Sequence, residues 1–177
     1  MMNILKENKV AILFLLVFVA LYISMNTIYG LFIEYYSPQA DPVTLNVSKQ
    51  VAWFLSWFDN TVNHTEVEGS RNILLSTGNR LVIRVFEGCN GINVMIVFVS
   101  FIIAFRGTLY QTIWFTLMGL VVIHVMNLGR VSLLYAVELY FPQYLYYIHK
   151  YLFTGFIYAV VFFIWYQWIK IVKRAVA

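Results

Sequence analysis

Three short segments of this sequence hold residues whose types could together carry out nucleophilic chemistry. Cys89 is the only cysteine of the 177 residues and lies in Glu87-Gly88-Cys89-Asn90-Gly91, Arg130 closes Asn127-Leu128-Gly129-Arg130, and His149 follows. A cysteine attacks as the thiolate, histidine moves protons near neutral pH, and a guanidinium donates several hydrogen bonds to an oxyanion. The three side chains are chemically complementary if the fold brings them together.

The surroundings of Cys89 suggest how its thiol would be activated. Cys89 stands where an apolar run begins, so we expect it at a helix N-terminus, which with a nearby cation (Arg130 or protonated His149) lowers the pKa of a thiol. Gly88 and Gly91 leave room for a substrate backbone beside the sulfur. A single cysteine excludes an internal disulfide and a multi-cysteine metal site, and no metal or organic cofactor is expected.

The composition predicts the elements that must position these residues. The chain is 62% hydrophobic and 11% charged, which is typical of an all-α polytopic membrane protein and not of a soluble domain. A hydrocarbon core of about 30 Å needs about 20 helical residues. Uncharged runs therefore predict four transmembrane helices in one domain over 1–177, at about 10–33, 89–105, 108–129 and 148–169. The first is read as an uncleaved signal anchor.

The cationic residues predict the orientation of these helices. They flank the predicted spans at alternate ends, at Lys6, Lys9, Arg106, Lys170, Lys173 and Arg174. Because such residues mark the cytoplasmic side, both termini are predicted to be cytoplasmic. Alternation then places Cys89, Arg130 and His149 together at the extracytoplasmic surface. The formal net charge of +4 is explained by these helix ends, so no nucleic-acid partner is expected.

Residues 34–87 would form the main extracytoplasmic segment. Asp41 is placed to cap a helix, and apolar residues at helical spacing over 43–58 predict an amphipathic helix at the membrane surface. Thr77-Gly78-Asn79 lies between β-prone runs, which predicts a small β-hairpin over 72–86. Residues 130–141 are predicted to form a separate short re-entrant or interfacial helix that ends before Pro142.

In these motifs the chain resembles the exosortase/archaeosortase family of membrane cysteine transpeptidases, and most of all the short exosortase F class. The resemblance covers roughly residues 80–155 and implies Cys89 as nucleophile, Arg130 as catalytic arginine and His149 as the third residue. It implies an enzyme of the prokaryotic inner membrane that cuts a C-terminal transmembrane sorting segment from exported proteins through an acyl–cysteine intermediate. The acyl group would pass to a lipid or polysaccharide acceptor or to water. Typical members are longer, and Lys150 beside His149 adds a like charge.

Other polar residues allow both a supporting and a purely structural interpretation. Glu87 is the better candidate to balance Arg130, while Asn90 and Asn127 either donate hydrogen bonds to the site or cap helix ends. His124, which lies inside the helix predicted over 108–129, either supports the site or hydrogen-bonds a neighbouring helix. A lone cysteine is often a small buried apolar residue, and an interfacial arginine is often an anchor. The alternative function is a non-catalytic membrane scaffold or assembly factor of a secretion or surface-polymer system.

Overall fold

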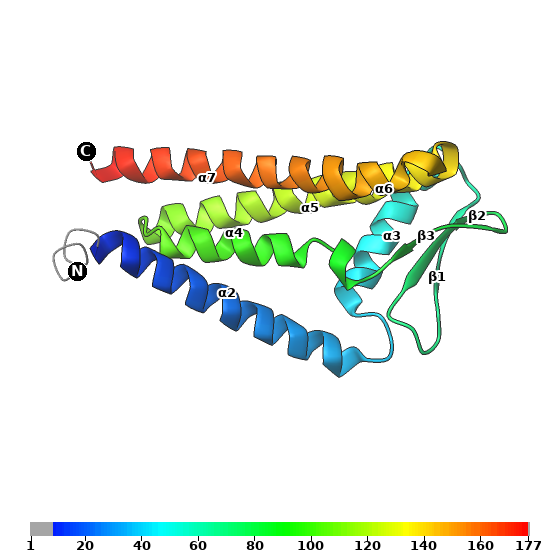
Figure 1. The fold of residues 1–177 in the computed structure, drawn as a ribbon, viewed down its shortest axis with the longest axis horizontal. Helices are drawn as coiled ribbons and strands as arrows, with labels where there is room; N and C mark the ends of the chain where they lie inside the picture. Colours follow the sequence, from blue (N-terminus) through cyan, green and yellow to red (C-terminus); the bar gives the residue numbers. More distant parts are fainter. Residues whose placement is uncertain (1–8, 177) are drawn as a thin grey trace.

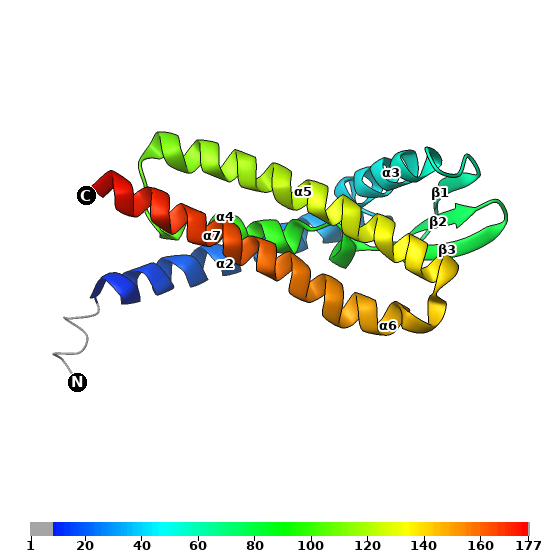
Figure 2. The ribbon, with the colours of Figure 1, turned by 90° about the horizontal axis from the view of Figure 1, so that it is seen from above.

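The computed structural model describes residues 9–176, apart from the side chains of residues 152–154 and 174–176. Long helices lie roughly side by side, and a small sheet and a crossing helix occupy one end of the bundle (Figure 1). The N-terminal end of helix α2 and the C-terminal end of α7 lie at the opposite end (Figure 2). Lys6 and the side chain of Arg174, used above to orient the helices, lie outside the described part.

Three stretches of the described chain are long and apolar enough to cross a membrane: Lys9–Tyr36, Leu109–Tyr140 and Pro142–Lys173. The first is helix α2 (Lys9–Tyr36), the second is α5 (Leu109–Tyr140), and the third ends in α7 (Thr154–Val176). The chain is therefore a multi-pass, mostly helical membrane protein. The fourth predicted span, α4, covers only Ile92–Ala104. Its 13 residues extend over about 20 Å, less than the usual core thickness.

Helix α4 starts at Ile92 and not at the predicted residue 89, because Gly91 interrupts the helix before it. Gly91 has φ +85°, a left-handed conformation that residues with a Cβ rarely adopt. Residues Glu87–Cys89 instead form a separate 3₁₀ turn, η1. Cys89 consequently lies in a turn before the helix, and not in its first turn as predicted.

Helix α5 runs without interruption from Leu109 to Tyr140, so the prediction of a separate short element at 130–141 is wrong. No glycine or proline follows Arg130 until Pro142, and the helix ends where proline prevents its continuation. At 1.5 Å per residue, Leu109 and Arg130 are about 32 Å apart along the axis. That distance equals the thickness of a hydrocarbon core of about 30 Å, so the part of α5 before Arg130 is long enough to cross a membrane.

Beyond Pro142 the chain turns back through short helical pieces. A 3₁₀ turn η2 (Pro142–Tyr144) and a short turn α6 (Leu145–Tyr147) lead into a π-helical segment η3 (Ile148–Phe153), which continues as α7. The fourth helix predicted from residue 148 thus begins as a π-helical segment that carries His149.

The extracytoplasmic segment predicted at 34–87 contains a helix and a three-stranded sheet. Helix α3 (Pro42–Ser56) is capped by Asp41, whose side chain accepts from the backbone of Val43 and Thr44. Strands β1 (Val62–Glu66), β2 (Ile73–Thr77) and β3 (Arg80–Val85) form an antiparallel sheet in the order β1-β2-β3. Strand β1 was not predicted, because its sequence VNHTE has no alternation of apolar and polar residues.

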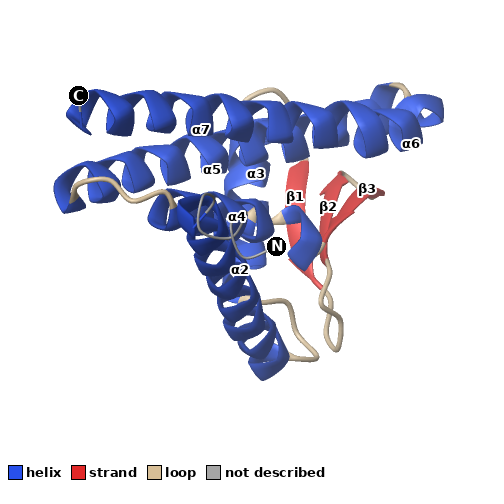
Figure 3. Ribbon diagram, turned by 60° about the vertical axis from the view of Figure 1, so that its left-hand side comes forward, coloured by secondary structure: helices blue, strands red, loops and turns tan. Residues whose placement is uncertain are grey.

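Helices α3 and α5 cover one face of this sheet and share a core with it. Figure 3 places the strands directly beside the helices. The buried core joins α3, all three strands, the η1 turn and the second half of α5 through Val47, Val51, Val62, Ile73, Leu75, Val82, Val85, Cys89, Val131 and Tyr135. A second core around Phe98 and Trp168 joins α4, α5 and α7.

Candidate active site

Cys89 is presented by a tight connection between the sheet and the helical bundle. Strand β3 ends at Val85, and the η1 turn closes through a hydrogen bond from the Cys89 backbone N–H to the Phe86 carbonyl, 2.8 Å long. Asn90 Oδ1 then accepts from the Ile92 backbone N–H at 3.0 Å and starts α4. Cys89 as a whole is only 6% exposed.

Burial raises the pKa of the Cys89 thiol, while the positive charge of Arg130 and a hydrogen bond with the Phe86 backbone act in the opposite direction. The expectation of a lowered thiol pKa is therefore wrong for this structure. Two features explain the difference: Cys89 precedes the helix instead of occupying its first turn, and removal from water disfavours the charged thiolate. The protein thus holds Cys89 mainly as the neutral thiol, which needs a base to become nucleophilic.

Asn127 ties the cysteine turn to the helix that carries the arginine. Its side-chain amide donates to the Cys89 carbonyl at 2.9 Å, and its Oδ1 accepts from Arg130 Nη1 at 3.5 Å. A Cβ at Gly91 would lie 3.0 Å from Asn127 Cγ, so the close approach requires glycine there. Residues three apart share a helix face, which explains the spacing of the Asn127–Arg130 motif.

Arg130 is close enough to influence both other members of the predicted triad electrostatically, Cys89 and His149. Its Nε is buried and has no hydrogen-bond partner, and among the described residues no carboxylate forms an ion pair with it. The guanidinium thus keeps donor capacity and charge that a substrate oxygen could use.

Glu87 does not balance Arg130 as predicted. Its Oε1 faces Arg71 Nε at 3.9 Å, and Arg71 also pairs with Glu34 at 2.8 Å through a different nitrogen. Arg71, in the β1–β2 connection, therefore braces the cysteine turn against the end of α2. Sequence reasoning missed this residue because the contact joins segments far apart in the chain.

His149 and Cys89 line the same cleft, of about 270 Å³. Strand β3 forms one wall, and α5 and the α6–η3 segment form the other, with Val131, Leu134 and Leu145 among the lining residues. Lys150 does not face this cleft: its Nζ donates to the Tyr146 hydroxyl at 2.9 Å and lies near the Tyr146 and Tyr151 rings. The structure therefore places Cys89 and His149 in one cleft, with Arg130 near enough to both for an electrostatic effect.

The two remaining supporting candidates, Asn90 and His124, make hydrogen bonds between the elements around the cleft. The side-chain amide of buried Asn90 donates to the Tyr29 hydroxyl at 2.6 Å and to Thr44 Oγ1 at 3.0 Å, linking the turn to α2 and α3. Thr44 in turn donates to the capping residue Asp41. His124 Nε2 lies 2.7 Å from Gln50 Oε1, so it joins α5 to α3 and belongs to the structural alternative weighed above.

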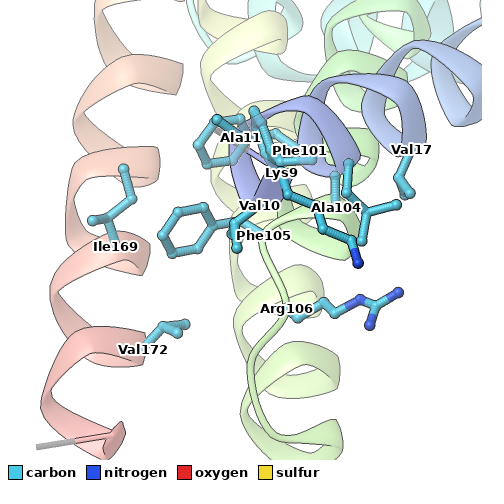
Figure 4. Close-up of a pocket in the computed structure, with 12 residues that line it drawn as sticks. Lys9, Val10, Ala11, Val17, Phe101, Ala104, Phe105, Arg106, Ile169 and Val172 are labelled. Atoms are coloured by element: carbon cyan, nitrogen blue, oxygen red, sulfur yellow. The ribbon is translucent and has the colours of Figure 1, made fainter. Parts of the chain in front are cut away.

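A larger cavity, of about 890 Å³, lies at the other end of the bundle, between the start of α2 and the end of α7 (Figure 4). Its lining is apolar apart from Lys9 and Arg106, and includes no cysteine, histidine or carboxylate. Within the described residues, no three His, Cys, Asp or Glu side chains group closely enough to hold a metal ion. The reactive groups are thus concentrated at the Cys89 cleft.

Comparison with known proteins agrees with this arrangement. No curated protein and no solved structure matches the chain. The family model described as transmembrane exosortase matches residues 8–167, a range that contains α2, the sheet, and all three motifs of the cleft. The predicted resemblance is confirmed at this level: the chain belongs to the transmembrane exosortase family.

Proposed function

We propose that this protein is a membrane cysteine peptidase and transpeptidase that cleaves a C-terminal sorting segment from exported proteins. The observation that carries the proposal is the cleft in which Cys89 and His149 meet, with Arg130 joined to the cysteine turn through Asn127. Family membership supports this reaction class, and the chemistry of the three side chains fits it. The exosortase F class stays a prediction.

The reaction begins from a neutral thiol. His149 takes the Cys89 proton as the sulfur attacks the scissile carbonyl carbon, forming a C–S bond and a tetrahedral oxyanion. When that intermediate collapses, the C–N bond breaks and the imidazolium returns the proton to the leaving amine. A nucleophile from the surface acceptor, or water, then attacks the thioester, transfers its own proton through His149, and releases the Cys89 thiol.

Arg130 is assigned the role of stabilising the oxyanion of the tetrahedral intermediate. It carries a fixed positive charge beside the thiol, and its buried Nε–H has no acceptor in the described structure. Fixed donors aimed at a developing negative charge lower the barrier because they need no reorganisation during the reaction. Asn127 is a positioning residue in this scheme, since it holds both the Cys89 carbonyl and the guanidinium.

The cleft would face the outside of a prokaryotic inner membrane, with both termini and Arg106 in the cytoplasm. This placement requires α4, with its flanking residues, to act as a fourth crossing despite its 13 residues. The transmembrane segment of the exported substrate would lie in the bilayer against the helices below the cleft. A lipid or polysaccharide would accept the acyl group, or water would.

The proposal is tested by replacing Cys89 with alanine in cells and following the C-termini of exported membrane-anchored proteins by mass spectrometry. We expect a defined set to keep its C-terminal segment in Cys89→Ala cells and to be processed again when wild type is restored. Asn93→Ala is the matched control, because exposed Asn93 lies four residues after the thiol, in the first turn of α4. Normal processing in Cys89→Ala, together with loss of function when the 43–86 segment is altered, would instead support the scaffold function.

A further inference from the structure

Strand β3 is an edge strand that leads straight to the cysteine. The sheet order is β1-β2-β3, so β2 occupies one side of β3. In the part of the chain that the structure describes, no strand pairs with its other side. An unpaired edge presents backbone N–H and C=O groups that can accept a further extended segment.

The Cys89 cleft runs along this edge. Five consecutive residues, 82–86, contribute to its lining, followed by Cys89. Because successive side chains of a strand point to opposite faces, a hollow over one face would meet only alternate residues. The cleft contacts Arg84 as well as its neighbours Ile83 and Val85, whose side chains point to the other face. The cleft therefore borders the strand lengthwise and ends at the thiol.

The register identifies Arg84 as a residue whose backbone is available there. The two-residue loop between Thr77 and Arg80 makes these two the first hydrogen-bonded pair of the hairpin. Val82 is the extra residue of a bulge in β3, opposite Leu75 and Ser76. Beyond this bulge, Leu74 and Arg84 form a non-hydrogen-bonded pair. The N–H and C=O of Arg84 therefore point away from β2, towards the free edge, and Arg84 lines the cleft.

We propose that the exported substrate binds as an added strand on the free edge of β3, in the residues that immediately precede its scissile bond. This proposal rests on the proposed function and specifies how that site recognises its substrate. Backbone pairing with β3 would hold the peptide extended and direct its next carbonyl to Cys89, because β3 passes directly into the η1 turn. Main-chain bonds supply affinity in such complexes, and pockets for alternate side chains supply specificity.

The direction of the added strand follows from the membrane topology. An exported protein approaches the membrane from outside and enters it at its C-terminal segment. Strand β3 likewise runs from the hairpin tip towards Cys89 at the start of α4. The two segments are therefore parallel. A second copy of this chain is the competing occupant of an exposed edge.

The first test removes one backbone donor and compares it with removal of the side chain alone. Arg84→Pro deletes the outward N–H at a position where a strand tolerates proline, whereas Arg84→Ala keeps it. We expect Arg84→Pro to process substrate about fivefold or more slowly than Arg84→Ala does, which corresponds to the loss of roughly one backbone hydrogen bond. Equal effects of both variants, or full activity of Arg84→Pro, would overturn the proposal.

The second test acts on the substrate and is independent of how the Arg84 variants fold. An exported protein whose processing stops in Cys89→Ala cells receives proline at each of six or so consecutive positions before its cleavage site, with alanine at the same positions as control. Because alternate N–H groups of a strand face its partner, we expect proline to inhibit at every second position. Inhibition by proline without this alternation, or no more inhibition by proline than by alanine, would contradict the added-strand model.

Three outcomes distinguish a failure of the added-strand proposal from a failure of the proposed function. Unchanged processing in Cys89→Ala cells contradicts the proposed function itself. Loss of processing there, with no alternation in the substrate scan, leaves the enzyme intact and contradicts only the strand addition. Wild-type processing accompanied by crosslinks between Arg84 positions of two copies would assign the edge to self-association and also overturns it.

Discussion

Asn127 makes the two contacts that fix the cysteine turn relative to the arginine. It is 1% exposed, donates to the Cys89 carbonyl at 2.9 Å, and accepts from Arg130. Sequence reasoning included it only as a supporting residue, because an asparagine near a helix end is equally well explained as a cap. The structure resolves that alternative: Asn127 lies inside α5, far from either helix end.

We predict that Asn127→Ala lowers the processing rate without removing the protein from the membrane. Loss of the amide leaves the buried Cys89 carbonyl without a donor, which costs about 1–3 kcal/mol, and frees the guanidinium. The expected decrease in rate is therefore about 5- to 150-fold. Asn127→Asp keeps an acceptor for Arg130 but loses the donor to Cys89, so a rate close to wild type for this variant would contradict the positioning role. Processing is measured by pulse-labelling of an exported substrate.

The raised pKa of the Cys89 thiol predicts how its reactivity depends on pH. We expect alkylation by a small reagent to increase with a midpoint above the ordinary thiol value of about 8.5. Since the charge of Arg130 favours the thiolate, Arg130→Ala should move the midpoint to still higher pH. Lys150→Ala also removes one positive charge, but Lys150 is engaged with tyrosines outside the cleft, so it should leave the midpoint unchanged. A lower midpoint in Arg130→Ala would contradict the assigned geometry.

The helical elements matter to the site because α4 and α5 carry its two halves. Helix α4 follows directly from the Cys89 turn, and α5 holds Asn127 and Arg130. Gly119 lies where α5 meets α4: a Cβ there would overlap the ring of Phe98, which is completely buried. By contrast, nothing lies within 4 Å of the Cβ position of Gly129 on the same helix.

This difference predicts opposite effects for two similar substitutions. Gly119→Ala should destabilise the protein by about 1–3 kcal/mol through overpacking. Gly129→Ala should be neutral or stabilise by up to about 1 kcal/mol, because alanine is the better helix former. Both are measured as denaturant-induced unfolding of the purified protein in detergent. Equal stability of the two variants would contradict close packing of α4 on α5.

Element boundaries show where sequence reasoning was sufficient and where it was not. The Asp41 cap, the helix after it and the strands on either side of Gly78 were predicted, because each has a local signal. Strand β1 was missed: it is held by pairing with β2 and lacks a pattern of its own. The break predicted at Arg130 came from its charge, yet a helix crossing out of the membrane can carry an arginine at the boundary without ending.

At the scale of the whole molecule, the two ends of the bundle differ in chemistry. One end carries the sheet, α3 and the Cys89 cleft, and the other carries Lys9 and Arg106 beside an apolar cavity (Figure 4). The meeting of Cys89, Arg130 and His149 was predictable because alternating helices bring their ends to one surface. The Asn90–Tyr29 bond and the Arg71–Glu87 pair were not, because they join segments whose approach depends on tertiary packing.

Orientation of the bundle gives the last prediction, made in a Cys89→Ala background that has no other thiol. Asn79→Cys places a thiol at the exposed tip of the β2–β3 hairpin, and Arg106→Cys places one just after α4. We expect a membrane-impermeant maleimide to label the first in intact cells and the second only after permeabilisation, because cationic helix ends favour the cytoplasm. Between these positions only α4 can cross the membrane, and its 13 residues must do so with help from flanking residues or local thinning of the bilayer. Labelling of Arg106→Cys in intact cells would mean that α4 does not cross, and the four-crossing topology would be lost even if the cleft itself faces outward.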